Sequence, residues 1–187
     1  MIYKVEIRDL CLCMTMDYDK LFEDALSDAL KDYSVNKIQF FSERDLQAHL
    51  FCECRRLMEE QHFPFPLKLH AEKTVFSKHA KVDLVLGDDE VLVELKLEPD
   101  YPGVSKPVVF STKRDGSRSI ESDLEKIDEY SHKSKAAHFV MIDEDGRHVR
   151  KLANEPWKAI YVKLDGPKRL VHYLHVKRDG RRAHYIE

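Results

Sequence analysis

The stretch KVDLVLGDDEVLVELKL, residues 81–97, contains two apolar runs separated by a short polar segment. Short runs rich in valine and leucine, bounded by turn residues, are typical of β-strands. We therefore expect strands at 80–86 and 91–98. Asp88-Asp89 lies in the polar segment, and aspartate is favoured in turns, so the two strands should form an antiparallel hairpin.

The register of this hairpin decides which side chains share a face. With Asp88-Asp89 as the loop, Leu84 faces Val93 and Asp83 faces Glu94. A slip of one residue would put the two carboxylates on opposite faces. In the expected register, one face is apolar and must be core: Val82, Leu84, Leu86, Val91, Val93, Leu95 and Leu97. The other face carries Asp83, Val85, Leu92, Glu94 and Lys96.

A hairpin immediately upstream adds a third carboxylate. With a loop at Ser77-Lys78, a strand expected at 67–76 pairs Glu72 with Asp83. Glu72, Asp83 and Glu94 would then form a row across three strands, and like charges opposite one another destabilise a sheet. Such a row needs a compensating cation. Lys96, on the same face as Glu94, is one, and a divalent metal ion is the other natural answer.

A helix expected from Ser42 to about Gln61 supplies a fourth carboxylate. Leu46, Leu50 and Leu57 define its buried stripe, and Glu53 lies in the middle of that stripe. A charged side chain is almost never fully buried unless it is paired. We therefore expect Glu53 to point towards the carboxylate row, with an ion pair to Arg56 or His49 on the helix surface as the alternative.

The remaining elements complete a mixed α/β domain. Apolar spacing predicts helices at 17–33 and 119–133, and His138–Asp143 reads as a buried strand. Asp-Gly pairs mark the turns of an antiparallel C-terminal meander, with strands expected at 157–164, 169–177 and 182–186.

The 187 residues fit one domain, with a core at about 43–143 and a C-terminal β extension at about 155–187.

Asp83, followed by Glu94-Leu95-Lys96 in the next strand, resembles the signature of the PD-(D/E)xK (restriction-endonuclease-like) nuclease superfamily. The preceding helix with its inward glutamate, and the following helix and strand, resemble the α-β-β-β-α-β core of that superfamily. The resemblance covers roughly residues 43–143. Val82 stands where the name-giving proline would be, a position that varies within the family. The resemblance implies Mg²⁺-dependent cleavage of phosphodiester bonds, usually in DNA, with Mn²⁺ as a substitute.

The resemblance also implies roles for the individual residues. Asp83 and Glu94 would hold Mg²⁺, together with the backbone carbonyl of Leu95. Lys96 would position the attacking water or stabilise charge in the transition state. Glu53 and Glu72 are candidates for a second metal ion or for hydrogen bonds to its waters. Asp123, Lys126 and Tyr130 flank the apolar stripe of the third helix. They could reach the mouth of the site, but we interpret them as a solvated helix edge.

Charge and composition constrain the partners. The net charge of -3 gives no global basic footprint, so a surface that binds nucleic acid must be local. Basic residues gather at 113–118, 147–151 and 177–182, and Tyr161, Tyr173 and Tyr185 are interspersed in the C-terminal meander. Together they could bind a phosphate backbone, with ordinary solvated hairpin tips as the alternative. The absence of a signal-like start or a long apolar run predicts a cytoplasmic protein that does not enter a membrane. A homodimer is a further expectation, because many nucleases of this class dimerise.

Two C-x-C pairs, Cys11 with Cys13 and Cys52 with Cys54, suggest a zinc site on spacing alone. However, residues two apart on a helix point about 200° apart, so one ion could hardly bind both Cys52 and Cys54. Buried structural cysteines are the default interpretation.

Two other functional classes remain open at this point. The same fold without catalysis would be a nucleic-acid-binding or protein-binding module, and it need not bind Mg²⁺. A structural or assembly protein that used the C-terminal meander as its interface would show no affinity for nucleic acid that falls with salt.

Overall fold

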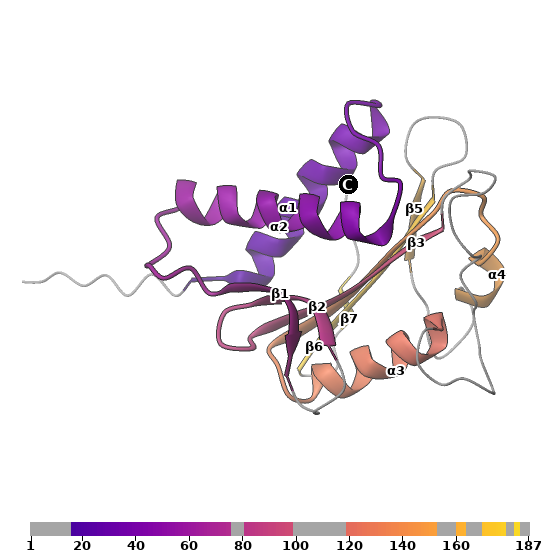
Figure 1. Ribbon diagram of the computed structural model, residues 1–187. Coiled ribbons are helices and arrows are strands. Elements are labelled where there is room, and N and C mark those ends of the chain that lie inside the picture. The colour runs from indigo at the N-terminus through magenta and orange to yellow at the C-terminus, as the bar shows by residue number, and fades with distance from the viewer. Residues whose placement is uncertain are drawn as a thin grey trace, which may run out of the picture.

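The chain folds as an α/β protein around one mixed sheet with helices on both faces (Figure 1). The computed structural model describes residues 16–75, 81–98, 119–152, 160–163, 170–178 and 182–183. Three further stretches lie outside these residues: 1–14, which the apolar-rich sequence predicts to be extended, 99–118, where Pro and Gly predict a loop, and the expected loop at Ser77-Lys78. The prediction of a mixed sheet flanked by helices is confirmed.

Four helices are described, and their starts follow ordinary capping chemistry. The helices are α1 (Tyr18–Ser34), α2 (Glu43–Glu60), α3 (Ile120–Ser131) and the short α4 (Val149–Leu152). Asp17, Ser42 and Ser119 are the N-caps of α1, α2 and α3, and each side-chain oxygen accepts a backbone N–H of the first turn.

Seven described strands form the sheet, in the order β1-β2-β3-β4-β6-β5, with β7 also paired to β6. Their bounds are β1 (Leu69–Thr74), β2 (Lys81–Leu86), β3 (Val91–Glu98), β4 (Ala136–Asp143), β5 (Ile160–Lys163), β6 (Leu170–Lys177) and β7 (Arg182–Ala183).

The first part of the sheet has the expected element order, α2-β1-β2-β3-α3-β4. β1, β2 and β3 are antiparallel neighbours, and α3 then crosses over so that β4 runs parallel to β3. The predicted hairpin register is confirmed, since Leu84 pairs with Val93 and Leu86 with Val91. The upstream hairpin also has the predicted register, with Leu69 opposite Leu86.

The C-terminal strands are antiparallel, as expected, and they belong to the same sheet. β6 pairs with β4 along its whole length, from Leu170–Asp143 to Lys177–Ala136. β5 and β7 then pair with different stretches of β6.

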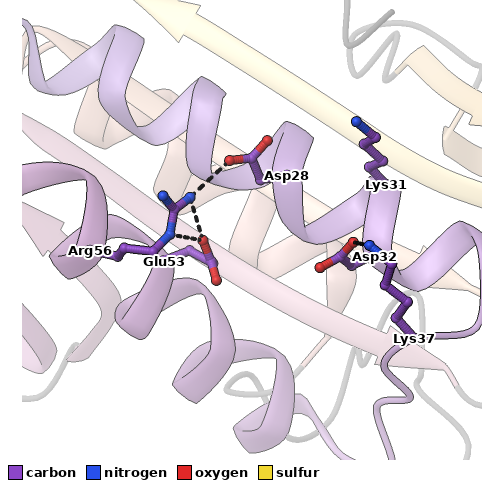
Figure 2. A pocket seen from close by; sticks show the side chains of 6 residues that line it. All are labelled: Asp28, Lys31, Asp32, Lys37, Glu53 and Arg56. Atoms are coloured by element: carbon purple, nitrogen blue, oxygen red, sulfur yellow. Dashed lines mark hydrogen bonds and ion pairs between the residues drawn. The ribbon is translucent and has the colours of Figure 1, made fainter. Parts of the chain in front are cut away.

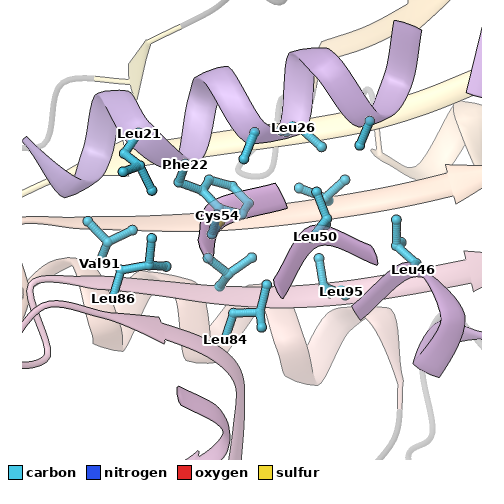
Figure 3. Packing of buried hydrophobic residues seen from close by; sticks show 14 of the residues in the cluster. Leu21, Phe22, Leu26, Leu46, Leu50, Cys54, Leu84, Leu86, Val91 and Leu95 are labelled. Atoms are coloured by element: carbon cyan, nitrogen blue, oxygen red, sulfur yellow. The ribbon is translucent and has the colours of Figure 1, made fainter. Parts of the chain in front are cut away.

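Each face of the sheet has its own apolar core. Leu84, Leu86, Val93 and Leu95 pack against α1 and α2 on one face, as Figure 3 shows for part of this cluster. Val85 and Leu92 pack against α3 on the other face. Val82 was expected with Leu84, and this was wrong, because Val82 packs in the α3 cluster. Strand β2 therefore changes the facing of its side chains at Asp83, between these two residues.

Among the described residues, no helix combines the length and apolar character needed to cross a membrane.

Candidate active site

Asp83 occupies a break in the sheet. The β1–β2 ladder continues on both sides of Asp83 but omits the Glu72–Asp83 pair, and the β2–β3 ladder stops at Leu84–Val93. Glu72 has a φ of 50°, in the left-handed region that a glutamate rarely adopts, which accounts for the lost pairing. The register is the same on either side, so the break frees Asp83 without changing which residues of β1 and β2 pair.

Contacts from two other elements fix Asp83 in this break. Its Oδ2 accepts a hydrogen bond from the backbone N–H of Leu95 at 2.7 Å. Its backbone carbonyl accepts a hydrogen bond from Nε2 of Gln47, on α2, also at 2.7 Å. The side chain of Asp83 therefore lies against β3, next to the two charged residues that flank Leu95.

Glu94 is buried between β3 and α3, with only 2% of its surface exposed. Tyr130 donates a hydrogen bond to its Oε1 at 3.2 Å, and the Lys126 ammonium lies 3.2 Å from its Oε2. Both partners come from α3, so the crossover helix covers the face of the hairpin that carries Glu94. The interpretation of Asp123, Lys126 and Tyr130 as a solvated helix edge was therefore wrong.

Lys96 is also largely buried, with 12% of its side chain exposed. Its ammonium lies 2.9 Å from Oδ2 of Asp123 and 3.3 Å from Oε2 of Glu43. Asp123 is 2% exposed and also pairs with Lys126 at 2.6 Å. The lysine thus lies between the start of α2 and the start of α3.

We call Glu43, Asp83, Glu94 and Asp123 the acidic cluster. Four ionised carboxylates beside the ammonium groups of Lys96 and Lys126 would leave a net charge of about -2, which one divalent cation would balance. Within the described part of the chain, the cluster does not bring three ligand atoms within 4.8 Å of one another. That is compatible with Mg²⁺, which commonly uses one or two carboxylates and keeps several waters.

Burial disfavours the ionised form of the two hairpin carboxylates, Asp83 and Glu94. Burial, reinforced by the charge of Asp83, raises the pKa of Glu94 to about 8. Burial likewise raises the pKa of Asp83 to about 6, against the opposing effect of its hydrogen bond from Leu95. Neighbouring carboxylates with raised pKa values are a common feature of functional sites, because a bound cation or substrate offsets the free-energy cost of ionising them.

The two lysines stay protonated in this environment. Burial alone would lower the pKa of Lys96, but the carboxylates of Asp123 and Glu43 outweigh it and raise the pKa. The same balance, with Glu94 and Asp123 as partners, raises the pKa of Lys126. Both side chains are therefore cationic donors rather than proton acceptors.

Glu53 lies elsewhere, which corrects the expectation that it points towards the carboxylate row. Its carboxylate is 2.9 Å from Arg56, and Arg56 is also 2.9 Å from Asp28 on α1 (Figure 2). The buried side of α2 is formed by Leu46, Leu50, Cys54 and Met58, so Glu53 adjoins the stripe instead of occupying it. Glu53 is also ten residues from Glu43, about 15 Å along the helix axis.

Glu72 is on the surface of β1. It pairs with Lys81 at 3.1 Å, and about half of its side chain is exposed. In the described part of the chain, no side-chain hydrogen bond or ion pair joins Glu72 to Asp83 or Glu94. Leu95 contributes its backbone N–H to Asp83, while its side chain packs in the core under α1 and α2.

Sequence reasoning missed Glu43 and Gln47, both near the start of α2. Acidic residues are common in the first turn of a helix, where they favour the helix dipole, so Glu43 gave no distinctive signal. The available signal was their spacing of four residues, which puts Glu43 and Gln47 on one side of α2.

One candidate nucleic-acid contact is contradicted. Tyr173 is buried, and its hydroxyl lies 2.9 Å from Nδ1 of His138, so it cannot stack on an exposed base. Arg147, Arg150, Lys151 and Arg178 are all exposed, and Arg147 also pairs with Glu98 at 3.2 Å. The basic group at 113–118, Tyr161 and Tyr185 fall outside the described side chains.

Comparisons of the chain with protein-family models, with curated proteins and with solved structures gave no match. The function is therefore inferred from the chemistry of the site itself.

Proposed function

We propose that this protein is a Mg²⁺-dependent nuclease that hydrolyses phosphodiester bonds in DNA. The observation that carries the proposal is the placement of Asp83, Glu94 and Lys96. Two buried carboxylates with raised pKa values lie on adjacent strands, next to a buried lysine that stays cationic. Such an arrangement is costly for stability, which favours a functional over a purely structural reading.

The order of elements supports a restriction-endonuclease-like core as the finer description of the fold. The hairpin β2–β3 carries the motif, α2 precedes it, and α3 crosses over to the parallel strand β4. Glu43 takes the place that Glu53 was expected to fill, as the carboxylate that the preceding helix brings to the site. Because one fold can host many functions, this order of elements adds to the site chemistry without replacing it.

The donor set fits Mg²⁺. Asp83 and Glu94 offer hard carboxylate oxygens, and the backbone carbonyl of Leu95 is the third candidate on the same hairpin. When bound, the ion would polarise the scissile phosphate and lower the pKa of the attacking water. Lys126, whose ammonium lies 3.2 Å from Glu94, would supply a second positive charge beside the phosphate.

Lys96 acts as a fixed positive charge in this account. Since its pKa is raised, it donates hydrogen bonds to the phosphate oxygens and does not accept the proton of the water. In the hydrolysis, the water oxygen bonds to phosphorus and the bond to the leaving sugar oxygen breaks. A proton passes from the water to that sugar oxygen through solvent, leaving a phosphomonoester and a free hydroxyl.

The test is cleavage of circular duplex, linear duplex, single-stranded and four-way-junction DNA, with Mg²⁺ or with a chelator. Lys96→Met keeps the length of the buried side chain and removes its charge, and Lys135→Met is the control on an exposed lysine. We expect cutting that needs Mg²⁺, is lost in Lys96→Met and persists in Lys135→Met.

Absence of cutting on every substrate, together with no Mg²⁺ binding by a folded protein, would overturn the proposal. DNA binding without Mg²⁺ affinity would then identify a catalytically silent nucleic-acid-binding module. Cutting that survives in Lys96→Met would place the catalytic centre elsewhere.

A further inference from the structure

A second group of ligand-type side chains lies on the opposite face of the sheet from the acidic cluster. His138 on β4 and His175 on β6 face each other directly across the antiparallel ladder. Their rings are stacked, with centroids 4.2 Å apart and an interplanar angle of 17°. Both are buried, at 0% and 1% exposure. Burying two imidazoles at this position costs more desolvation free energy than burying an apolar pair, so a compensating interaction is expected.

A carboxylate from α1 completes the group. Oδ1 of Asp19 lies 2.9 Å from Nε2 of His138 and 3.0 Å from Nε2 of His175. The two imidazole Nε2 atoms therefore converge on one oxygen atom. In the described part of the chain, these three residues are the one group whose ligand atoms all lie within 4.8 Å of one another.

The other ring nitrogens face orienting groups. Nδ1 of His138 lies 2.9 Å from the hydroxyl of Tyr173, and Nδ1 of His175 lies 3.2 Å from a carboxylate oxygen of Glu23. Metal-binding histidines almost always present one nitrogen to the ion and hold the other against a carboxylate, carbonyl or water. Here Nδ1 of His175 faces a carboxylate and Nδ1 of His138 faces a hydroxyl, which leaves both Nε2 atoms directed to the same oxygen of Asp19.

Hydrogen bonds between the carboxylates and the imidazoles account for only part of this arrangement. His138 makes a hydrogen bond to Asp19, but His175 has neither ring nitrogen in hydrogen-bond geometry, although carboxylate oxygens lie close to both. A cation between Asp19 and the two rings would satisfy the buried lone pairs. Lys177 lies 3.4 Å from the second oxygen of Asp19, on an exposed side chain that neutralises the outer side of that carboxylate.

The spacing suits a small transition-metal ion. Ligand atoms about 2.0–2.1 Å from a tetrahedral Zn²⁺ are roughly 3.3 Å from one another. The observed separations of 2.9 and 3.0 Å need only a small expansion. Imidazole nitrogens favour Zn²⁺ and its transition-metal neighbours, whereas Mg²⁺ favours oxygen ligands. The ligand set therefore separates this site chemically from the acidic cluster.

We propose that Asp19, His138 and His175 form a Zn²⁺ site that ties the first turn of α1 to the central strands β4 and β6. A water molecule supplies the fourth ligand, because the Glu23 carboxylate faces Nδ1 of His175 and not the shared Nε2 side. The burial of both histidines assigns the ion a structural role. The site does not depend on the proposed nuclease activity, because its ligands come from other residues on the other face.

The experiment is a titration of the untagged, metal-free chain with Co²⁺, a spectroscopic probe for Zn²⁺. We expect one equivalent of Co²⁺ to produce a visible d–d band and Zn²⁺ to displace it. The band should lack thiolate charge-transfer absorption, which would instead indicate binding by cysteines. Zn²⁺ should also raise the thermal midpoint of the protein, since it binds the folded state.

Asp19→Asn is the decisive variant, because Asp19 is partly exposed and the substitution keeps its size. Asp17→Asn is the matched control, since Asn preserves the N-cap of the same helix. We expect Asp19→Asn to weaken Co²⁺ binding by at least about 100-fold, more than the usual loss for an outer-shell group. Unchanged binding in Asp19→Asn, or no stoichiometric binding by the folded wild-type protein, would overturn the proposal.

Discussion

The ammonium of Lys96 lies 2.9 Å from Oδ2 of Asp123, a carboxylate that is only 2% exposed. The two residues come from β3 and α3, so this ion pair fixes the crossover helix against the hairpin. A buried ion pair contributes little net stability, but removing one partner leaves an uncompensated charge. Asp123 is therefore best understood as a positioning residue that holds Lys96 and Lys126 in place.

Asp123→Asn should slow cleavage by about 10–100-fold, the usual cost of losing a group that orients a metal-site residue. The physical reason is that Lys96 and Lys126 lose their shared anchor. Single-turnover cleavage measures the effect. A pH–rate profile flatter than that of the wild-type protein would indicate altered electrostatics at the lysines, because a loss of folded protein would lower the rate equally at every pH. Asp128→Asn, on an exposed position of the same helix, is the control. A wild-type rate in Asp123→Asn would contradict the positioning role.

Glu94→Gln should change how the stability of the metal-free protein depends on pH. The pKa of Glu94 is raised by burial to about 8, so folding favours its neutral form. That contribution is fully present below about pH 4.5 and is lost as the pH rises through about 8. Gln is neutral throughout, so the variant should gain stability relative to wild type, by up to a few kcal/mol, across this interval. Urea denaturation in chelator at several pH values measures the difference, and a constant difference would refute the prediction.

Mg²⁺ should stabilise the folded protein through Asp83. At a concentration 100 times its Kd, a ligand that binds only the folded state adds about 2.7 kcal/mol. We expect Mg²⁺ to raise the thermal midpoint of the wild-type protein and of Asp88→Asn, whose substituted side chain is exposed on the β2–β3 turn. The shift should vanish in Asp83→Asn, which retains an oxygen that can accept from Leu95. Equal shifts in both variants would exclude Asp83 as a ligand.

The two cysteines of α2 should react very differently with alkylating reagents. Cys54 is buried against the core, and burial raises the pKa of its thiol to about 12, so almost no thiolate is present at neutral pH. Cys52 is exposed on the other side of the helix. Peptide mapping after brief alkylation should find Cys52 modified and Cys54 protected until the protein unfolds. Equal modification in the native protein would contradict the packing of α2.

The hairpin could be predicted from sequence because its information is local. Alternating side chains and a polar turn between 87 and 90 allow only one register that buries the apolar residues together. The order of elements followed from the same kind of local periodicity. The change of facing at Val82 could not be predicted in this way, because it depends on the backbone of Glu72 in the neighbouring strand.

The candidate site was only partly predictable, because its later members depend on contacts between elements. Choosing Leu57 for the buried stripe of α2 placed Glu53 inward, whereas the buried residues are Cys54 and Met58. Asp123 looks like an ordinary first-turn acid until β3 brings Lys96 to it. His138 and His175 are 37 positions apart, and only the β4–β6 register pairs them.

The most direct test of the central claim compares two glutamine substitutions that each remove one carboxylate. Glu94→Gln acts at the buried hairpin residue beside Lys126, and Glu53→Gln acts at the Arg56 ion pair on the other face of the sheet. Mg²⁺-dependent cleavage of DNA is measured for both folded variants beside the wild-type protein. We predict that Glu94→Gln abolishes cleavage and that Glu53→Gln leaves it unchanged. Cleavage that survives Glu94→Gln but disappears in Glu53→Gln would contradict the assignment of the active site.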